Sequence, residues 1–398
     1  MKRILFVVNT LGGGGAERAL LELLGQLKGR DCEVSLYVLL PQGRLAGEVP
    51  EYVRRLNRRL DPRPVLDRSG RRALAWKVAG ALLAGGGLWG SLGLMAGQYR
   101  QMRRQGRVQW DKLLWPAVAR GRECLGEEFD LAVAWMEGGS AYYVADRVRA
   151  KRKAAVIHVD HRQAGYSRAL DGGCWERFDR IFGVSGETRD CFLEVYPEYA
   201  GKTGVLPNIV DQERIRRRAE EPGGFADGWQ GLRLLTVGRL TYQKAYDVAI
   251  DAMRLLKDRG CPARWYVLGE GEQRGSLERK LTALGLTGDF FLLGMVENPF
   301  PYYAQADLYV HATRFEGKSI AIQEAQTLGC AVVASDCSGN RQQVEDGVDG
   351  VLCPLTPEGV AGAVERLLAD REARERMGRT AREKRFPNNQ AEELLRML

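Results

Sequence analysis

The stretch from Asp307 to Ser335 constrains the fold of this chain more strongly than any other part of the sequence. Its opening segment DLYVHAT and the later AVVAS are short apolar runs rich in β-branched residues, as buried strands are. Between them, SIAIQEAQTLG predicts a helix that begins at the N-cap Ser319 and ends before Gly329. Strand, glycine turn, helix and strand in this order form the connecting unit of a parallel α/β sheet.

Two glutamates, Glu316 and Glu324, stand eight residues apart in this unit. Glu316 lies in the loop before the helix, where the backbone N–H groups of a helix N-terminus favour anions. Glu324 shares a helical stripe with Ile320 and Leu328, so we expect its carboxylate to be partly buried and to need a polar partner. Because open α/β sheets bind ligands at the carboxyl ends of their strands, the pair predicts a binding site.

The rest of the chain repeats the strand-and-helix pattern in two successive arrays, each long enough to bury its own core. Residues 207–230 separate the arrays and are rich in proline, glycine and charge, which is the composition of an interdomain linker. The sequence therefore predicts an α/β protein with two Rossmann-like β/α/β domains, residues 1–206 and 231–398, which face each other across a ligand-binding cleft. We expect the last helix to pack back on the first domain.

The positive charge of the chain is concentrated in one region. The net charge is +8 overall, but residues 51–72 alone carry eight arginines against three acids, and residues 99–107 carry four arginines and no acid. Such local basicity favours a surface contact over a general nucleic-acid partner. The eight cysteines form no C-x-x-C pair, and the chain has no D-x-D triplet, so we expect free thiols in a reducing cytoplasm and no metal site.

Residues 78–98 form a run of 21 residues without a charge. The length would admit a membrane span, but seven glycines and arginine-rich flanks on both sides disfavour one. Two interpretations remain open. Residues 51–107 form an interfacial surface on an anionic membrane, with Trp76 and Trp89 as anchors, or the run is a buried helical hairpin beside an arginine-covered surface.

A glycine-rich loop, residues 12–15, follows the first predicted strand and opens a helix. Gly13 and Gly14 allow close approach of the backbone to a ligand phosphate. No Lys-Ser/Thr pair follows, so this is not a P-loop, and the contiguous glycines with Glu17 do not match the dinucleotide fingerprint. A tight turn without a ligand fits the pattern equally well.

Four motifs in consistent order carry a family resemblance: VGRLTYQKAYDVAIDA, EGKSIAIQEA, LPNIVD and GNRQQVEDGVDGVL. Together they resemble the second domain of the family-4 retaining glycosyltransferases, enzymes of the GT-B fold that use sugar nucleotides. The resemblance covers residues 184–356, and the first half matches more loosely through FDLAVAWMEGG and the strand before His158. EGKSIAIQEA together with NPFPYYAQADLYV is most similar to the branch that builds bacterial capsule and O-antigen repeat units.

The resemblance implies roles on the donor side. Arg239 and Lys244 would face the donor diphosphate and stabilise its charge as it leaves. Glu316 would accept hydrogen bonds from donor-sugar hydroxyls, and Glu324 would hold the ribose. The other residues expected at the donor site are Gly13, Gly14, Gly269, Gly317, Lys318, Ser319 and Ile320. Lys318 stands where many members have an aromatic residue, and it would add a cation at the phosphate site.

On the first domain, the resemblance implies that His158 lies near the donor sugar, with His161 as the fallback. The expected catalytic residues are thus His158, Glu316, Arg239 and Lys244. Glu137 and His161 are the acceptor-side candidates, although a water-exposed turn explains Glu137 equally well. His311 lies within an apolar strand and is expected in the core.

The expected reaction is transfer of a hexose-type unit from a UDP- or GDP-sugar to a glycan or lipid-linked glycan, with retention and without metal or cofactor. The expected location is cytoplasmic, peripheral on the inner face of a bacterial membrane. The alternatives are a nucleotide-sugar epimerase of the same architecture and a non-catalytic, membrane-associated sugar-nucleotide-binding protein. A nicotinamide oxidoreductase is disfavoured because VLGEGEQRG spaces its glycines one residue too far and carries Glu270 and Glu272, which would repel a pyrophosphate.

Overall fold

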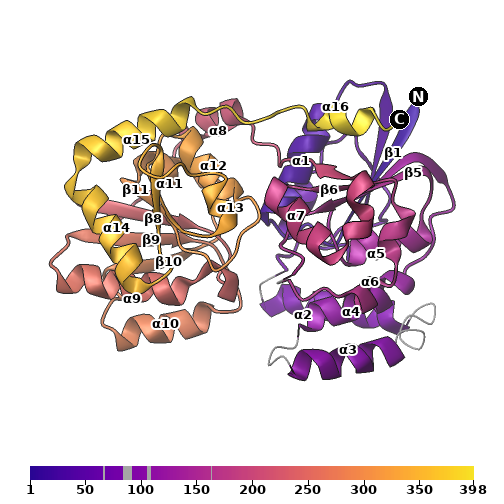
Figure 1. Ribbon diagram of the computed structural model, residues 1–398, viewed down its shortest axis with the longest axis horizontal. Helices are drawn as coiled ribbons and strands as arrows, with labels where there is room; N and C mark the ends of the chain where they lie inside the picture. Colours follow the sequence, from indigo (N-terminus) through magenta and orange to yellow (C-terminus); the bar gives the residue numbers. More distant parts are fainter. Residues whose placement is uncertain (66–67, 84–91, 105–108, 163) are drawn as a thin grey trace. The chain divides into compact units, whose positions relative to one another are not determined.

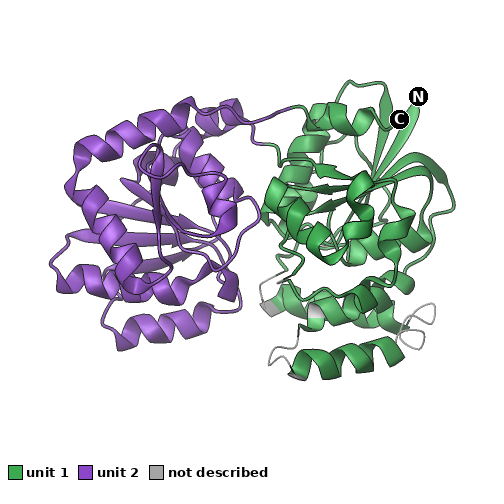
Figure 2. Cartoon of the chain, in the orientation of Figure 1, with its two compact units in different colours: residues 1–209, 389–398 green, residues 210–388 purple. Residues whose placement is uncertain are grey.

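The computed structural model describes residues 1–65, 68–83, 92–104, 109–162 and 164–398. The chain divides into two compact units, which Figure 2 shows in different colours. Unit 1 comprises residues 1–209 and 389–398, and unit 2 comprises residues 210–388. Each unit contains one parallel β-sheet covered by helices.

Unit 1 contains a seven-stranded parallel sheet in the order β3-β2-β1-β4-β5-β6-β7 (Figure 1). Its strands are β1 (Lys2–Val8), β2 (Cys32–Val38), β3 (Arg54–Arg55), β4 (Glu128–Ala134), β5 (Arg149–Ile157), β6 (Arg180–Gly183) and β7 (Thr203–Val205). Its helices are α1 (Gly15–Leu27), α2 (Arg68–Leu83), α3 (Leu92–Arg104), α4 (Trp110–Arg120), α5 (Gly139–Arg147), α6 (Arg168–Asp171), α7 (Gly186–Val195) and α16 (Gln390–Leu395).

The central strands of this sheet are apolar and buried in their C-terminal halves, because helices cover both faces there. In β1 the run Ile4–Val8 is fully buried. The largest buried side chains on one face are Tyr143 of α5, Phe192 of α7 and Trp175 of a 3-10 helix (Cys174–Arg177), which pack into one core cluster. These aromatic side chains supply much of the apolar area that stabilises unit 1.

Helices α2, α3 and α4 form an addition between β3 and β4. The uncharged run 78–98 divides between α2 and α3, while residues 84–91, including Trp89, lie outside the described residues. Helix α3 packs on α4 through Met102 and Leu113, as a buried hairpin would. Trp76 of α2, however, is 79% exposed, as an interfacial anchor would be. Within the described ranges, no helix is long and apolar enough to cross a membrane.

Unit 2 contains a six-stranded parallel sheet in the order β10-β9-β8-β11-β12-β13. Its strands are β8 (Leu232–Val237), β9 (Ala263–Leu268), β10 (Phe290–Gly294), β11 (Leu308–His311), β12 (Val332–Ser335) and β13 (Gly350–Cys353). Its helices are α8 (Gln212–Ala219), α9 (Tyr246–Asp258), α10 (Arg274–Ala283), α11 (Phe300–Gln305), α12 (Ile320–Thr327), α13 (Ser338–Arg341), α14 (Pro357–Ala369) and α15 (Arg371–Glu383). The predicted unit of strand, turn, helix and strand is thus confirmed as β11, α12 and β12.

Two apolar clusters lie on opposite faces of the unit 2 sheet. One contains side chains of α9, α10 and α14, such as Met253 and Val364, packed on β8, β9 and β11. The other contains side chains of α8, α11 and α12, such as Ile215 and Ile322. Alternate residues of β8 divide between the clusters, because successive side chains of a strand point to opposite faces.

The structure differs from the sequence-based expectation at the linker. The boundary between units falls after Ile209, and residues 210–230, expected as linker, belong to unit 2 and contain α8. Asp211 caps this helix, since its carboxylate accepts the N–H of Arg214 at 2.9 Å, and Ile215 is buried. A capped helix with one apolar side chain facing the core is ordered despite its charged composition. The last helix, α16, lies in unit 1 and contacts α1.

Candidate functional site

The candidate donor site lies where the strand order of unit 2 reverses. From β8 the chain proceeds outward through β9 to β10, and then returns to place β11 on the other side of β8. The loops after β8 and β11 therefore both lie at the carboxyl edge where the strand order reverses, the usual ligand position in such sheets. Arg239 and Lys244 follow β8, and Glu316 follows β11.

The Glu316 carboxylate is the centre of a buried polar cluster. Its Oε2 atom accepts a hydrogen bond from His311 Nε2 at 3.1 Å. The same oxygen forms an ion pair with the Lys244 ammonium group. The other ring nitrogen of His311 lies 3.0 Å from the Tyr309 hydroxyl. His311 is buried, as expected, but it also orients Glu316, a contact that the sequence-based assignment to the core missed.

Charges in this cluster shift the protonation equilibria of its members. Burial raises the pKa of the Glu316 carboxyl, but the Lys244 charge and the His311 hydrogen bond outweigh burial and lower it to about 2. Burial, together with the Lys244 charge, lowers the pKa of His311. Glu316 is therefore ionised and His311 neutral at pH 7, so His311 donates one ring N–H to the carboxylate.

Several hydrogen bonds between the two loops hold Lys244 and Glu316 close to each other. The Thr313 hydroxyl donates to the Gln243 carbonyl at 2.9 Å, and the Gln243 amide donates to the Phe315 carbonyl at 2.9 Å. The Arg314 guanidinium pairs with Asp247 at 2.6 Å, which joins the β11 loop to the start of α9. The loops after β8 and β11 thus form one hydrogen-bonded assembly.

Glu324 is buried on α12, as its place in an apolar stripe predicts, and is 9% exposed. Its polar partner is Tyr303 of α11, whose hydroxyl donates to Oε2 at 3.0 Å. Ser319 occupies the N-cap of α12, but its side chain makes no capping hydrogen bond. Gly329 follows the end of the helix with φ +75°, which confirms its expected position.

Two cationic side chains of this edge have no partner among the described residues. Arg239 is exposed, and Lys318, in the turn before α12, is half-buried. Burial lowers the pKa of Lys318. Both side chains are thus available to an anion, in contrast to Lys244, which is already paired with Glu316.

Close backbone approaches explain two glycines of the site. A Cβ atom on Gly269 would lie 1.9 Å from the carbonyl oxygen of Gly238, so the loops after β8 and β9 touch there. A Cβ atom on Gly339 of α13 would lie 2.3 Å from the Glu316 carbonyl oxygen and 2.5 Å from that of Gly317. Gly269 therefore allows the loops after β8 and β9 to pack closely, and Gly339 supports the turn that carries Glu316.

The corresponding edge of unit 1 lies between β1 and β4, where its strand order reverses. Asn9 follows β1, and its amide bonds to the turn between β4 and α5 and to the start of α5: Nδ2 donates to the Glu137 carbonyl at 3.3 Å, and Oδ1 accepts the Ser140 N–H at 2.7 Å. Glu137 is 3% exposed, and its carboxylate accepts the His158 N–H at 2.9 Å. The alternative of a water-exposed turn for Glu137 is therefore wrong, because this bond anchors its side chain.

His158 directly follows β5, as expected for a side chain at the carboxyl edge. Burial lowers the pKa of its ring, which rests on Trp135 at 5.6 Å between ring centroids. The Nε2 atom is buried and has no hydrogen-bond partner in the described part of the chain. A buried nitrogen in this state costs free energy unless a ligand or water satisfies it.

His161, the fallback for His158, lies elsewhere. It is fully buried in an aromatic box, with its Nε2 atom 3.0 Å from Asp171 and its ring stacked on Tyr166. Asp171 also accepts hydrogen bonds from Tyr142, Trp175 and Tyr196, which hold it ionised inside the core. The assignment of His161 to the acceptor side is therefore corrected, because the side chain has no exposed surface.

The glycine-rich loop carries an acidic side chain. A Cβ atom on Gly14 would lie 2.6 Å from a carboxylate oxygen of Glu17, and one on Gly13, at φ +98°, would lie 2.6 Å from Arg44 Nε. Glu17 is 8% exposed. Its carboxylate would repel a phosphate at Gly14, so the geometry disfavours Gly14 as a phosphate contact. Across the residues that the structure describes, no group of three or more acidic, histidine or cysteine side chains is placed to hold a metal ion.

Comparison with known proteins defines the fold. The crystal structure of HepE from Anabaena in complex with UDP-glucose superimposes with a TM-score of 0.67 over 100% of both chains, at 18% identity. Sucrose-phosphate synthase from Thermosynechococcus elongatus gives a TM-score of 0.64 over 99% of this chain and 95% of that one, at 16% identity. The two Rossmann-like, parallel-sheet domains have the GT-B fold, which confirms the predicted fold class.

Sequence similarity is concentrated in unit 2. Residues 230–384 match the family described as Glycosyl transferases group 1. Alpha-D-kanosaminyltransferase of Streptomyces kanamyceticus is 36% identical over 152 residues, which are 37% of this chain and 39% of that protein. A Campylobacter jejuni enzyme, N-acetylgalactosamine-N,N'-diacetylbacillosaminyl-diphospho-undecaprenol 4-alpha-N-acetylgalactosaminyltransferase, is 32% identical over 39% of this chain and 41% of its own length. The chain thus spans less than half of the length of these two relatives, and the family match includes every donor-side candidate after residue 230.

Proposed function

We propose that this protein is a retaining glycosyltransferase that moves a sugar from a nucleotide diphosphate sugar to an acceptor hydroxyl. The observation that carries the proposal is the cluster of Lys244, Glu316 and His311 at the reversal point of the unit 2 sheet, beside the N-terminus of α12. Arg239 and Lys318 add cationic side chains without partners among the described residues. The match of residues 230–384 to Glycosyl transferases group 1 supports the same reading.

Each group has a physical role in this reaction. The bond between the anomeric carbon and the diphosphate oxygen breaks, and a bond from that carbon to the acceptor oxygen forms on the same face. Negative charge develops on the departing diphosphate, where Arg239, Lys244 and the backbone N–H groups at the start of α12 stabilise it. The acceptor proton passes to the departing phosphate oxygen. Metal-independent transfer is part of the proposal.

Carboxylates of unit 2 orient the donor. Both donors to Glu316, Lys244 and His311, contact Oε2, so Oε1 is the atom that we assign to a donor-sugar hydroxyl. Glu324, held by Tyr303, is assigned to the ribose hydroxyls. On unit 1, the buried Nε2 atom of His158 is assigned to a hydroxyl of the transferred sugar.

The proposed acceptor is a glycan linked to a membrane lipid, as in bacterial surface polysaccharide synthesis. Support comes from the basic addition of unit 1, where the exposed Trp76 lies among arginines on α2. Relatives named for lipopolysaccharide core synthesis in Rhizobium meliloti and amylovoran synthesis in Erwinia amylovora support a role in polysaccharide assembly. Peripheral contact with an anionic membrane surface follows from this acceptor.

Incubation with a panel of UDP- and GDP-sugars and a lipid-linked acceptor tests the function. Release of nucleotide diphosphate with a glycosylated product supports transfer, whereas an isomerised donor without release would indicate an epimerase. The test variant is Arg239→Ala, and the control is Arg279→Ala, an exposed arginine of α10. We expect a loss of about a hundredfold or more in kcat/KM for Arg239→Ala only. Equal activity of the two variants would refute the donor assignment.

A further inference from the structure

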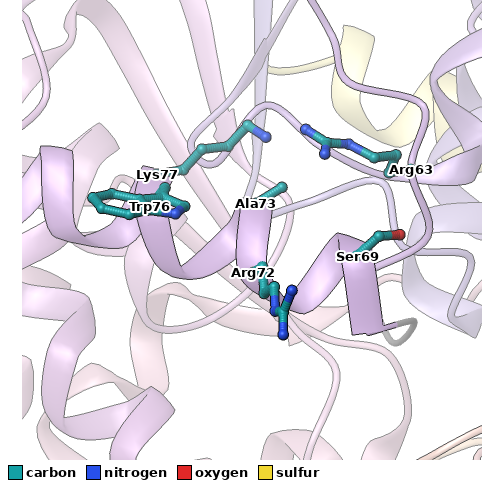
Figure 3. A pocket seen from close by; sticks show the side chains of 6 residues that line it. All are labelled: Arg63, Ser69, Arg72, Ala73, Trp76 and Lys77. Carbon is teal, nitrogen blue, oxygen red and sulfur yellow. The ribbon is translucent and has the colours of Figure 1, made fainter.

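A cavity on helix α2 lies outside the site described so far. It is open to solvent, has a volume of about 470 Å³ and is lined by Arg63, Ser69, Arg72, Ala73, Trp76 and Lys77. Figure 3 shows the ends of Lys77 and Arg63 directed toward one another above Ala73, with the Trp76 ring at the far end. Cations at one end and an aromatic ring at the other give the cavity an amphipathic character.

Asp61 organises the cationic end of the cavity. Its carboxylate binds Arg63 at 2.7 Å and Lys77 at 2.7 Å, so both cations are held in fixed positions. Arg72 is exposed, and no partner of its side chain occurs among the described residues. Asp61 pairs with Arg63 and Lys77, and Arg72 adds a third cationic side chain to the lining. These four groups carry a net charge of +2, which is the balance that a diphosphate would neutralise.

The cavity is tied by hydrogen bonds to the glycine-rich loop. Gln42 is the connecting residue: its carbonyl accepts the Leu11 N–H at 2.9 Å, and its side chain accepts a bond from Lys77 at 3.0 Å. The Gln42 amide also donates to the Gly70 carbonyl of α2 at 2.8 Å. Val65 lies against Gly12, where an added Cβ atom would meet its side chain at 2.8 Å. The cavity is therefore built onto the carboxyl edge of unit 1, which also carries Glu137 and His158.

Beyond the cationic end of the cavity, the exposed face of α2 becomes apolar. Ser69, Arg72, Trp76 and Leu83 follow one another at helical spacing, and Trp76 and Leu83 are 79% and 77% exposed. Contact with an apolar partner would remove both side chains from water, which is favourable. A ligand with an anionic head and an apolar tail matches both halves of this face.

We propose that this cavity binds the diphosphate group of a prenyl-diphosphate-linked acceptor, with the prenyl chain along Trp76 and Leu83. The inference rests on the proposed transferase function and names the chemical class of its acceptor. Arg63, Arg72 and Lys77 bind the phosphate oxygens, and the attached glycan extends toward the glycine-rich loop. The diphosphate is thereby recognised by charge at a fixed distance from the carboxyl edge of unit 1.

Calorimetric titration of the full chain with farnesyl diphosphate tests the proposal, with farnesol and inorganic diphosphate as partial probes. Saturating UDP is added so that the donor site does not take up the diphosphate. The variants are Arg72→Gln, inside the cavity, and Arg71→Gln, its exposed neighbour on α2 outside the lining. We expect Arg72→Gln to weaken farnesyl diphosphate binding about tenfold and Arg71→Gln to leave it unchanged. Trp76→Ala weakens binding of farnesyl diphosphate but not of inorganic diphosphate.

Equal effects of the two arginine variants, or affinity for farnesol equal to that for farnesyl diphosphate, would overturn the proposal. A parallel titration with phosphatidylglycerol vesicles separates the two sources of phosphate. Equal loss of vesicle binding in both variants, without binding of farnesyl diphosphate, assigns this face to bulk membrane lipid and refutes the acceptor site. Binding of UDP is measured separately, so the donor site and the cavity fail or succeed independently.

Discussion

His311 Nε2 lies 3.1 Å from Glu316 Oε2, the same carboxylate oxygen that pairs with Lys244. A histidine at the end of a buried strand thus fixes the orientation of a glutamate five residues later. No bond to the other oxygen, Oε1, occurs among the described residues, so the free oxygen has a defined direction. His311 is accordingly a positioning residue, whereas Glu316 is the residue assigned to contact the donor.

Replacement of His311 tests this positioning role. In His311→Ala, Glu316 loses one of its two anchors, and we expect kcat to fall about tenfold to a hundredfold with nucleotide affinity within about threefold of the original. Tyr309→Phe removes the contact with His311 Nδ1, together with a longer bond of 3.4 Å to the Val237 carbonyl. It leaves the bond between His311 and Glu316 in place, so we expect a smaller fall of kcat. Steady-state kinetics with titration of UDP gives both quantities. An equal loss of nucleotide affinity in His311→Ala would show that the histidine contacts the donor itself.

The low pKa of Glu316 predicts a pH-dependent stability. The folded pKa of about 2 lies below the ordinary value of 4.5, so the ionised carboxylate stabilises the folded form. This contribution is complete above about pH 4.5 and is lost as the pH falls toward about 2. We expect the stability advantage over Glu316→Gln to shrink by up to about 3 kcal/mol between pH 6 and pH 2.

Urea denaturation of both proteins across this pH range measures the difference. The same experiment on Glu198→Gln, an exposed carboxylate paired with Arg168 at the surface of unit 1, supplies the comparison. Surface pairs contribute little, so its curve follows the original protein closely. A constant gap between the original protein and Glu316→Gln at all pH values would contradict the buried ion pair.

The positive φ of Ala245 predicts that one substitution at this position stabilises the protein. It directly follows Lys244 and has φ +46°, the one left-handed residue other than glycine among the described residues. Ala245→Gly removes this strain, and we expect a gain of about 0.5 to 1 kcal/mol after the loss of one buried methyl group. Ala249→Gly, inside the same helix α9, is the matched control and should lose about 1 kcal/mol. Thermal unfolding measures the stability of both variants. A lower stability of both would show that Ala245 is not strained.

The contact of Gly269 with Gly238 predicts severe intolerance of a side chain. The added methyl group of Gly269→Ala would overlap the Gly238 carbonyl, so the loops after β8 and β9 must separate. We expect a loss of about 3 kcal/mol or more, together with loss of UDP binding. Gly260→Ala has open space around its Cβ at φ +75°, so it measures the cost of a positive φ without a steric overlap, at about 1 kcal/mol. Similar losses in the two variants would argue against the steric contact.

The sequence predicted the elements that local chemistry determines. Glu324 shares its stripe with Ile320 and Leu328, and the structure buries it as that periodicity requires. Gly329 follows the end of α12 with φ +75°, at the position that the sequence predicted. Short apolar strands between glycine turns gave the order of elements, because a parallel sheet buries such strands on both faces.

What the sequence did not predict depends on contacts between distant segments. The partner of Glu324 is Tyr303, which lies 21 residues earlier on another helix. The full burial of His161 results from Asp171 and aromatic side chains of several elements, whereas its place two residues beyond a strand end resembled that of His158. The charged segment after Ile209 forms α8, because Ile215 packs into an apolar cluster of unit 2. No local pattern specifies these partners.

The division of the chain into units has a consequence for synthesis. Unit 2 is one continuous stretch, residues 210–388, inserted before the last ten residues of unit 1. During translation, unit 2 is complete while α16, which contacts α1, is still to be made. Until residues 389–398 leave the ribosome, the surface of α1 that α16 covers therefore remains open to other contacts.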